Sequence, residues 1–309
     1  MFKYHIFALL LGTILDYVFG NIYCMWNPFD TIKDWVKFLD RALLGDEIIL
    51  LEKSKQRSLG AWLIILVVFP VFAGITFFTM LTYEIHPWFG VLFEALASYF
   101  CLNFNRLYYG GFGVAADYYG NGVSAMKHAA SILIGRQVEV DTEEGITSDT
   151  ITYIANEASD SVLSPLFVMF LFGPVGGFIY RALDIIEGQI GTFETGTYNA
   201  RYDYFGQPIV KLNSIIDYLP SRFSGALVVF CARHTFGGFN GKNARFIHLR
   251  DRKKAISAFA GALEIGLDDG KIGDFDKPIQ VSDINKAVNL LKNSFMVCQA
   301  FFVILLLFF

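Results

Sequence analysis

The stretch that decides the fold spans residues 156–190 and reads NEASDSVLSPLFVMFLFGPVGGFIYRALDIIEGQI. It opens with a polar cluster, continues as an apolar run from Val162 to Phe172, and then places one proline and three glycines within five residues. Because proline and glycine interrupt helices, the pattern predicts two half-length helical arms joined by a tight turn. Polar side chains at the mouth of such a membrane hairpin cost free energy unless something uses them.

Two interpretations of residues 162–190 remain open. A re-entrant hairpin would return Glu187 to the membrane face at which Asp160 enters, with protein covering the irregular backbone at the turn. The alternative is a single spanning helix that is kinked at Pro174.

The composition places the whole chain in a bilayer. Hydrophobic residues make up 54% of the 309 residues and charged residues only 17%, with a mean hydropathy of +0.45, whereas soluble domains carry about 25% charged residues. The net charge of −4 gives no indication of nucleic-acid binding. The four cysteines lie far apart with no Cys-x-x-Cys pair, which argues against a disulfide scaffold or a zinc site.

Long apolar runs predict the membrane spans. We expect these spans at residues 2–20, 59–83, 88–108 and 295–309. The last run of 15 residues reaches only about 22 Å as a helix, short of the roughly 30 Å hydrocarbon core. Local thinning of the bilayer, or a helix that begins before Phe295, would make up the difference.

Basic residues predict the orientation. Residues 21–57 hold six lysines and arginines and residues 233–294 hold eleven, whereas the connection at 84–87 holds none. The positive-inside rule therefore places 21–57 and 233–294 in the cytoplasm and the turn at 84–87 outside. Three spans then leave 109–161 inside, and if 162–190 re-enters, the whole of 109–294 faces the cytoplasm.

The predicted fold is a single all-α domain over residues 1–309, a polytopic helical membrane protein. Its periodic stretches are helical, and no segment shows the alternation of a strand. Residues 219–232 add an apolar arm that is too short to span comfortably. The predicted site faces the cytoplasm, in a multi-pass protein of the cell membrane.

Spacing groups the polar residues of the candidate site. Asn156 and Asp160 are four residues apart and share a helix face, and Asp184 and Glu187 share another at a spacing of three. Carboxylates near arginines at a membrane face suit a substrate made of phosphate and Mg²⁺, because the acids hold the metal and the arginines bind phosphoryl oxygens. The simpler alternative is structural ion pairing, for which the spacing offers these pairs: Arg181 with Asp184, Arg201 with Asp203, and Arg222 with Asp217.

Several short motifs follow one another in a characteristic order. They are Leu15-Asp16 with Gly20, Asn27-Pro28, Gly135-Arg136, Ala155 to Asp160, Ser164-Pro165-Leu166-Phe167, Tyr180-Arg181-Ala182, Gly191 with Arg201-Tyr202 and Phe205-Gly206, Leu219-Pro220-Ser221-Arg222, and Ala260-Gly261-Ala262-Leu263. In order and spacing this set resembles the CobD/CbiB membrane family, the adenosylcobinamide-phosphate synthases of cobalamin biosynthesis. The similarity spans most of the chain.

The resemblance implies an enzyme, a carbon–nitrogen ligase that forms an amide between a corrinoid carboxylate and aminopropanol phosphate. It implies ATP and Mg²⁺, although no recognised nucleotide motif is present. The implied catalytic residues are Asp160, Glu157, Asp184 and Glu187, and Asp160, Asp184 and Glu187 would also hold Mg²⁺. The implied substrate and phosphate ligands are Asn156, Ser159, Arg181, Arg201, Tyr202, Lys211 and Arg222.

The sequence departs from the family pattern before Ala260, where a basic stretch replaces a polar loop. A non-catalytic membrane protein, comparable to the distantly related AmpE, is therefore the alternative. The basic residues that would then bind anionic lipid or a partner protein are Arg245, His248, Arg250, Arg252, Lys253 and Lys254. A transporter is disfavoured because the spans are few and no inverted repeat is visible.

Overall fold

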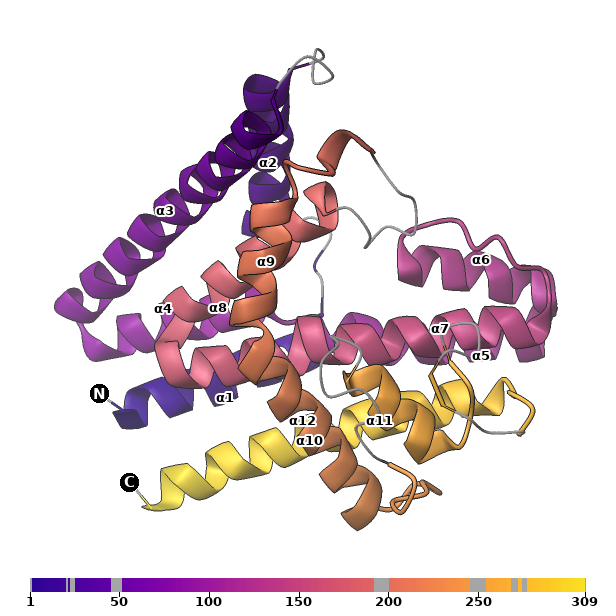
Figure 1. Ribbon diagram of the computed structural model, residues 1–309. Helices are drawn as coiled ribbons and strands as arrows, with labels where there is room; N and C mark the ends of the chain where they lie inside the picture. Colours follow the sequence, from indigo (N-terminus) through magenta and orange to yellow (C-terminus); the bar gives the residue numbers. More distant parts are fainter. Residues whose placement is uncertain are drawn as a thin grey trace. The chain divides into compact units, whose positions relative to one another are not determined.

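The fold is known from a computed structural model. It describes residues 2–20, 22, 26–45, 52–191, 200–244, 254–267, 272–273 and 277–308. The helices in chain order are α1 (Phe2–Phe19), α2 (Pro28–Leu44), α3 (Lys53–Ile85), α4 (Pro87–Cys101), α5 (Phe104–Asn121), α6 (Val123–Ile134), α7 (Glu143–Ala158), the π-helical turn η2 (Ser159–Leu163), α8 (Ser164–Ile190), the 3-10 turn η3 (Ala200–Tyr202), α9 (Gln207–Ile216), α10 (Tyr218–His234), α11 (Lys254–Leu263) and α12 (Ser282–Phe308). Within these residues the structure has no strand, which confirms the all-α prediction (Figure 1).

The chain divides into two compact units. The first comprises Met1–Gly12, Ile22–Cys101 and Pro165–Tyr218, and the second comprises Thr13–Asn21, Leu102–Ser164 and Leu219–Phe309.

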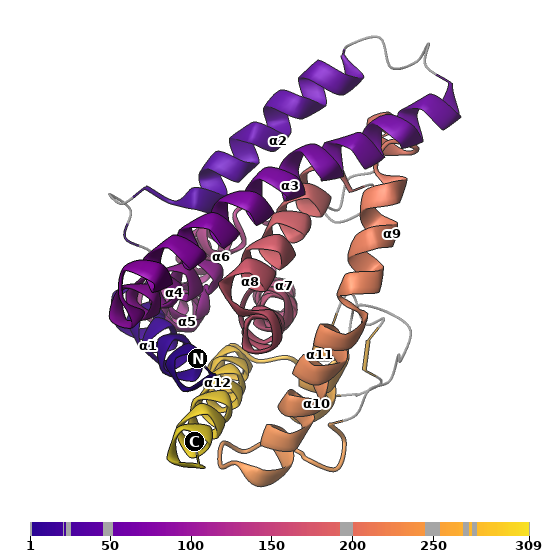
Figure 2. The same ribbon diagram turned by 90° about the vertical axis from the view of Figure 1, so that its left-hand side faces the viewer.

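In the first unit, α2 and α3 form a helical hairpin (Figure 2). The Asn27 side chain accepts a 2.9 Å hydrogen bond from the Phe29 backbone, and Pro28 fills the first helical position, so α2 starts with a complete N-cap. Its apolar face buries Phe29, Ile32, Val36 and Leu39. The long helix α3 also packs against α4 and α9.

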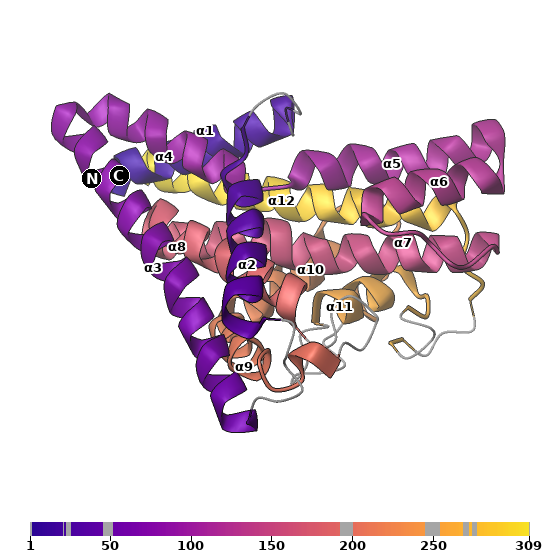
Figure 3. The ribbon, with the colours of Figure 1, turned by 90° about the horizontal axis from the view of Figure 1, so that it is seen from above.

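In the second unit, α5, α6, α7 and α12 lie side by side (Figure 3). The chain reverses between α5 and α6 at Gly122, whose φ of 83° lies in the region that glycine tolerates. Helix α11 packs against α7 and α12, and all of its residues are buried.

The predicted span at 88–108 is wrong as a continuous helix. The structure ends α4 at Cys101 and begins α5 at Phe104. The break is held by the buried carboxylate of Asp16, which accepts a hydrogen bond of 2.9 Å from the Phe104 backbone. Hydropathy does not reveal such a break, because it depends only on the local residues. It contains no information on a distant side chain that caps the helix.

Helix α8 contains the predicted Pro/Gly break. Gly173 has φ 66° and ψ −164°, a non-helical conformation, and Pro174 follows it. The helical path into α8 begins well before residue 162, because α7, η2 and α8 run on from Glu143 to Ile190. Whether the two arms of α8 enter from the same membrane face stays a prediction.

Four helices of the described chain are long and apolar enough to cross a bilayer: Phe2–Phe19, Lys53–Ile85, the run Glu143–Ile190, and Ser282–Phe308. The pair α9 and α10, bent by 50°, adds a fifth if it acts as one span. Helix α12 begins at Ser282, so its 27 residues reach about 40 Å and exceed the hydrocarbon core.

Candidate functional site

Polar side chains of α8 and α9 form a set of hydrogen-bonded pairs, here called the α8–α9 ladder. The Tyr180 hydroxyl donates to Asp217 over 2.8 Å, and the Asn213 amide donates to Glu187. Tyr180 and Glu187 are seven residues apart, and Asn213 and Asp217 are four apart, so each pair shares one face of its helix. The four side chains are buried, which makes their pairing a requirement of folding.

Arg181 and Asp184 extend the ladder. The guanidinium donates to the Asp184 carboxylate over 2.8 Å, and this carboxylate side chain keeps 29% exposure. This is the structural pairing that the spacing predicted.

A second cluster of the first unit joins η3 to α2 and is here called the Asp40 anchor. The Tyr202 hydroxyl donates to the Asp40 carboxylate over 3.0 Å, and an Arg201 nitrogen lies 3.5 Å from the same oxygen. Burial raises the pKa of the Tyr202 phenol above its ordinary value, and the Asp40 carboxylate raises it further. Tyr202 therefore stays protonated, as a donor, well into the alkaline range.

Arg201 thus forms an ion pair with Asp40, a partner that the spacing did not predict. Asp40 could not be selected from sequence patterns, because it lies 161 residues from Arg201 in an amphipathic helix. Lys211 is exposed on α9.

The second unit holds a third polar cluster, around the π-helical turn η2, here called the π-turn cluster. The Asn156 amide donates to Asp160 over 3.1 Å, as their spacing predicted, and the Ser161 hydroxyl donates to Glu157. The buried Ser159 hydroxyl lies 2.7 Å from that of Ser224 on α10. Single π-helical turns within α-helices occur frequently at functional sites.

Asp160 and Glu157 are half-buried, so solvent or a substrate can reach them. Arg222 is also half-buried, on α10. Nearby in the same unit, the ammonium group of Lys254 donates to the Ser221 hydroxyl over 3.2 Å. Lys254 keeps only 3% exposure, which excludes this lysine as part of the predicted surface for lipid or a partner. The other basic residues of that surface lie outside the described residues.

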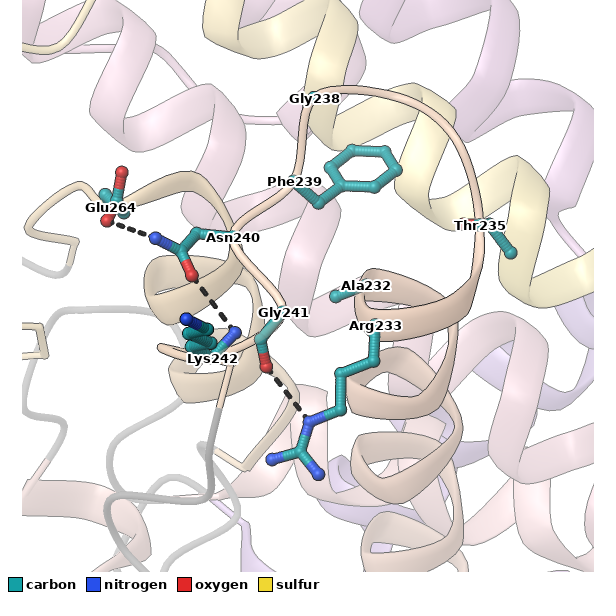
Figure 4. A pocket seen from close by; sticks show the side chains of 9 residues that line it. All are labelled: Ala232, Arg233, Thr235, Gly238, Phe239, Asn240, Gly241, Lys242 and Glu264. Atoms are coloured by element: carbon teal, nitrogen blue, oxygen red, sulfur yellow. Dashed lines mark hydrogen bonds between the residues drawn. The ribbon is translucent and has the colours of Figure 1, made fainter.

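An open hollow of about 1040 Å³ lies where α10 ends (Figure 4). Arg233 and Lys242 contribute its cations, and the Arg233 guanidinium donates to the Gly241 carbonyl over 3.0 Å. The Glu264 carboxylate accepts hydrogen bonds from the amides of Asn240 and Asn243, at 2.6 and 2.8 Å. These residues could not be selected from the sequence, because their loop has no recognised nucleotide motif.

Metal coordination by Asp160, Asp184 and Glu187 stays a prediction. Asp160 belongs to the second unit, and the other two belong to the first. Among the residues that the structure describes, no group of three histidines, cysteines or acids is placed to hold a metal ion. Asp184 and Glu187 instead face Arg181 and Asn213.

Apolar helices of spanning length define the class: the chain is a multi-pass helical membrane protein. The sequence profile of the family described as CobD/Cbib protein matches residues 9–291, so the chain belongs to the CobD/CbiB family. This match covers all three polar clusters and the hollow.

Curated relatives agree with this assignment. The cobalamin biosynthesis protein CobD of Clostridium perfringens (strain 13 / Type A) is 28% identical over 306 residues, which cover 92% of each chain. The protein of that name from Listeria monocytogenes serovar 1/2a is 26% identical and covers 90% of this chain and 91% of its own. That from Brucella melitensis biotype 1 is 28% identical over 84% of this chain and 80% of its own. No solved structure matches the chain.

Proposed function

We propose that the chain is an adenosylcobinamide-phosphate synthase, which joins a carboxylate of adenosylcobyric acid to the amine of aminopropanol phosphate at the expense of ATP. The family match over residues 9–291 carries the proposal. It is supported by carboxylates and arginines that lie within the matched segment and form hydrogen-bonded clusters.

The chemistry sets what the site must supply. A carboxylate and an ammonium ion do not condense directly, because the carboxylate has no good leaving group and the protonated amine has no lone pair. Transfer of the terminal phosphoryl group of ATP to the corrinoid carboxylate gives an acyl phosphate and ADP. The deprotonated amine then attacks the acyl carbon, the C–N bond forms, the C–O bond to phosphate breaks, and inorganic phosphate leaves.

We assign the removal of the ammonium proton to Asp160. A general base must reach its proton, and Asp160 is half-buried at the π-helical turn, whereas Glu187 is only 1% exposed and held by Asn213. Glu157, held by Ser161, is the neighbouring carboxylate that would share this work.

Cationic side chains are assigned to the phosphates. In the first unit, Arg201 and Tyr202 of the Asp40 anchor would hold one phosphate, assisted by Arg181 and Lys211. In the second unit, Arg222 would take the same role, with the half-buried Asn156 orienting the reacting groups, whereas Ser159 is buried against Ser224. The apolar helices would cover the large corrinoid.

The hollow at the end of α10 is the place that we propose for the phosphates of ATP. Arg233 and Lys242 line the hollow and would bind the phosphate oxygens. The Glu264 carboxylate also lines the hollow, and its negative charge is hydrogen-bonded to the side-chain amides of Asn240 and Asn243. Gly238 lines the hollow, and a Cβ at this residue would meet nothing within 4 Å, which leaves room for the close approach of a phosphate group.

The direct test incubates the purified protein in detergent with adenosylcobyric acid, aminopropanol phosphate, Mg²⁺ and ATP. The expected result is a stoichiometric amide product and ADP, measured by mass spectrometry. An authentic family enzyme prepared in parallel is the control. If that enzyme converts the substrates and this protein does not, the proposal is wrong.

A non-catalytic membrane protein of the same family is the second candidate. The basic stretch that replaces the family's polar loop favours it, although Lys254 of that stretch is buried against Ser221. Loss of ligase activity together with retained binding of adenosylcobyric acid would support this candidate.

A further inference from the structure

The break in α8 interrupts the regular path of the helix. Gly173 has a non-helical φ of 66° and ψ of −164°, and Pro174 follows it. Pro174 has no N–H, so it offers nothing to the carbonyl of Phe170, four residues earlier. A carbonyl in an apolar surrounding must find another donor.

His5 of α1 supplies that donor. Its Nε2 lies 3.2 Å from the Phe170 carbonyl oxygen, and its Nδ1 is hydrogen-bonded to the Glu94 carboxyl of α4. The second Glu94 oxygen accepts a hydrogen bond of 2.7 Å from the Tyr83 hydroxyl of α3. One hydrogen-bonded chain thus joins four helices of the first unit at the break.

The hydrogen atoms in this chain can be counted. A carbonyl oxygen only accepts, so His5 Nε2 carries a hydrogen. One further proton lies between Nδ1 and Glu94, either on the imidazole or on the carboxyl group, so the pair is neutral in total. Glu94 keeps 3% exposure, and a buried carboxyl group with one partner removed is strongly destabilised.

The break connects this chain of hydrogen bonds with the candidate site. The second arm of α8 carries Tyr180, Arg181, Asp184 and Glu187 of the α8–α9 ladder. The direction of this arm depends on the conformation at Gly173, where an added Cβ would lie 3.8 Å from Glu94 and 3.9 Å from His5. Any group that holds the angle between the two arms of α8 therefore also determines the position of the ladder side chains.

We propose that His5, Glu94 and Tyr83 are positioning residues, which hold the two arms of α8 at one angle and so place the ladder for catalysis. The catalytic part of this inference rests on the proposed synthase function. The structural part, a fixed angle between the arms, stands without it.

The structural part is tested by the distance between spin labels at Leu171→Cys and Gly188→Cys, in a protein with its native cysteines replaced. Leu171 is exposed on the first arm, and a Cβ at Gly188 meets nothing within 4 Å. We expect one narrow distance distribution in the otherwise unchanged protein. His5→Phe and Glu94→Leu should broaden it, whereas Tyr4→Phe, on the exposed side of α1, should not.

Glu94→Gln separates hydrogen bonding from charge. Its amide can donate to a neutral His5 Nδ1 while its oxygen still accepts from Tyr83, and His5 Nε2 keeps its hydrogen for Phe170. We therefore expect Glu94→Gln to retain the narrow distribution. An unchanged distance distribution in Glu94→Leu would overturn the inference. A distance distribution in Glu94→Gln as broad as that in Glu94→Leu would overturn it as well. Tyr83→Phe, which removes one hydroxyl, should give partial broadening even if the harsher variants do not fold.

The catalytic part is tested by steady-state kinetics of the same variants. Misplacement by about 1 Å lowers turnover by on the order of 100-fold, so His5→Phe and Glu94→Leu should lower kcat by about 10- to 100-fold, with KM for ATP unchanged. Equal and normal kcat in both variants would refute the catalytic role. A wild-type protein that is inactive but shows the narrow distribution would instead contradict the proposed function and leave the structural part standing.

Discussion

Removal of the Asp40 carboxylate should lower the affinity of the protein for aminopropanol phosphate. In Asp40→Ala, Tyr202 loses the acceptor of its 3.0 Å hydrogen bond and Arg201 loses its 3.5 Å partner. A hydrogen bond to a charged group contributes about 1.5–3 kcal/mol. The ion pair contributes roughly 0–1 kcal/mol, because Arg201 keeps 27% and Asp40 15% side-chain exposure.

Together these contacts stabilise the positions of Arg201 and Tyr202 by about 2–3 kcal/mol. The two contributions do not add fully, because both contacts use one carboxylate oxygen. If Arg201 and Tyr202 bind the phosphate of aminopropanol phosphate, KM for this substrate should rise by about 30- to 100-fold, because 1.4 kcal/mol corresponds to a factor of ten. Tyr202→Phe should give a smaller rise of roughly tenfold, and the double variant should show non-additive effects.

The assay measures initial rates against aminopropanol phosphate at saturating ATP and corrinoid, with thermal unfolding followed in parallel. Asp30→Ala is the matched control, because Asp30 lies on the same helix in an exposed pair with Lys33, and its change should stay within about 0.5 kcal/mol. A normal KM in Asp40→Ala, with the protein folded, would refute the assignment of Arg201 and Tyr202 to the phosphate.

Three further predictions concern the other clusters. Asp160→Ala should lower kcat by about 100- to 10,000-fold if this carboxylate takes the ammonium proton, and an unchanged turnover would remove it from the site. In the hollow, Arg233→Ala and Lys242→Ala should each raise KM for ATP by roughly tenfold without a change in KM for the amine, and a normal KM for ATP in both would place the nucleotide elsewhere. Single cysteines at Glu144 and Gly188 should react with an impermeant thiol reagent from the same membrane face if α8 re-enters, and labelling from opposite faces would show a spanning helix.

Controls for these variants come from the second unit. Lys127 and Asp141 form an ion pair of 2.5 Å in which the Asp141 side chain keeps 84% exposure, and neither residue belongs to the hollow or to the π-turn cluster. Lys127→Ala and Asp141→Ala alter one charge each, as Lys242→Ala and Asp160→Ala do. Both should retain wild-type kinetic constants.

Patterns along the chain predicted the parts of the fold that depend on local physics. The break at Gly173 followed from Pro174 and three glycines, and the pair of Asn156 with Asp160 followed from their spacing. Both features arise within one helix or one turn, where sequence distance fixes spatial distance.

Contacts between distant helices were not predictable in the same way. Asp40 and Arg201 meet only because α2 and η3 pack together, and His5 meets Glu94 only because α1 and α4 do. The break between Cys101 and Phe104 likewise depends on Asp16, which caps α5 from α1. A carboxylate in an apolar run indicates that a hydrogen-bond donor must pair with it. The identity of that donor cannot be deduced from the sequence, because several donors in the chain would satisfy the same charge.

The pairing of the acids bears on which of them can act in catalysis. A carboxylate that is buried and already holds a donor, such as Glu187 with Asn213 or Asp217 with Tyr180, gains its stability from remaining in place. Proton transfer to it would disturb a contact on which folding depends. Asp160 also accepts a hydrogen bond from Asn156, but part of its surface at the π-helical turn is open to solvent. This exposure is the reason why we propose Asp160, and not Glu187 or Asp217, as the general base.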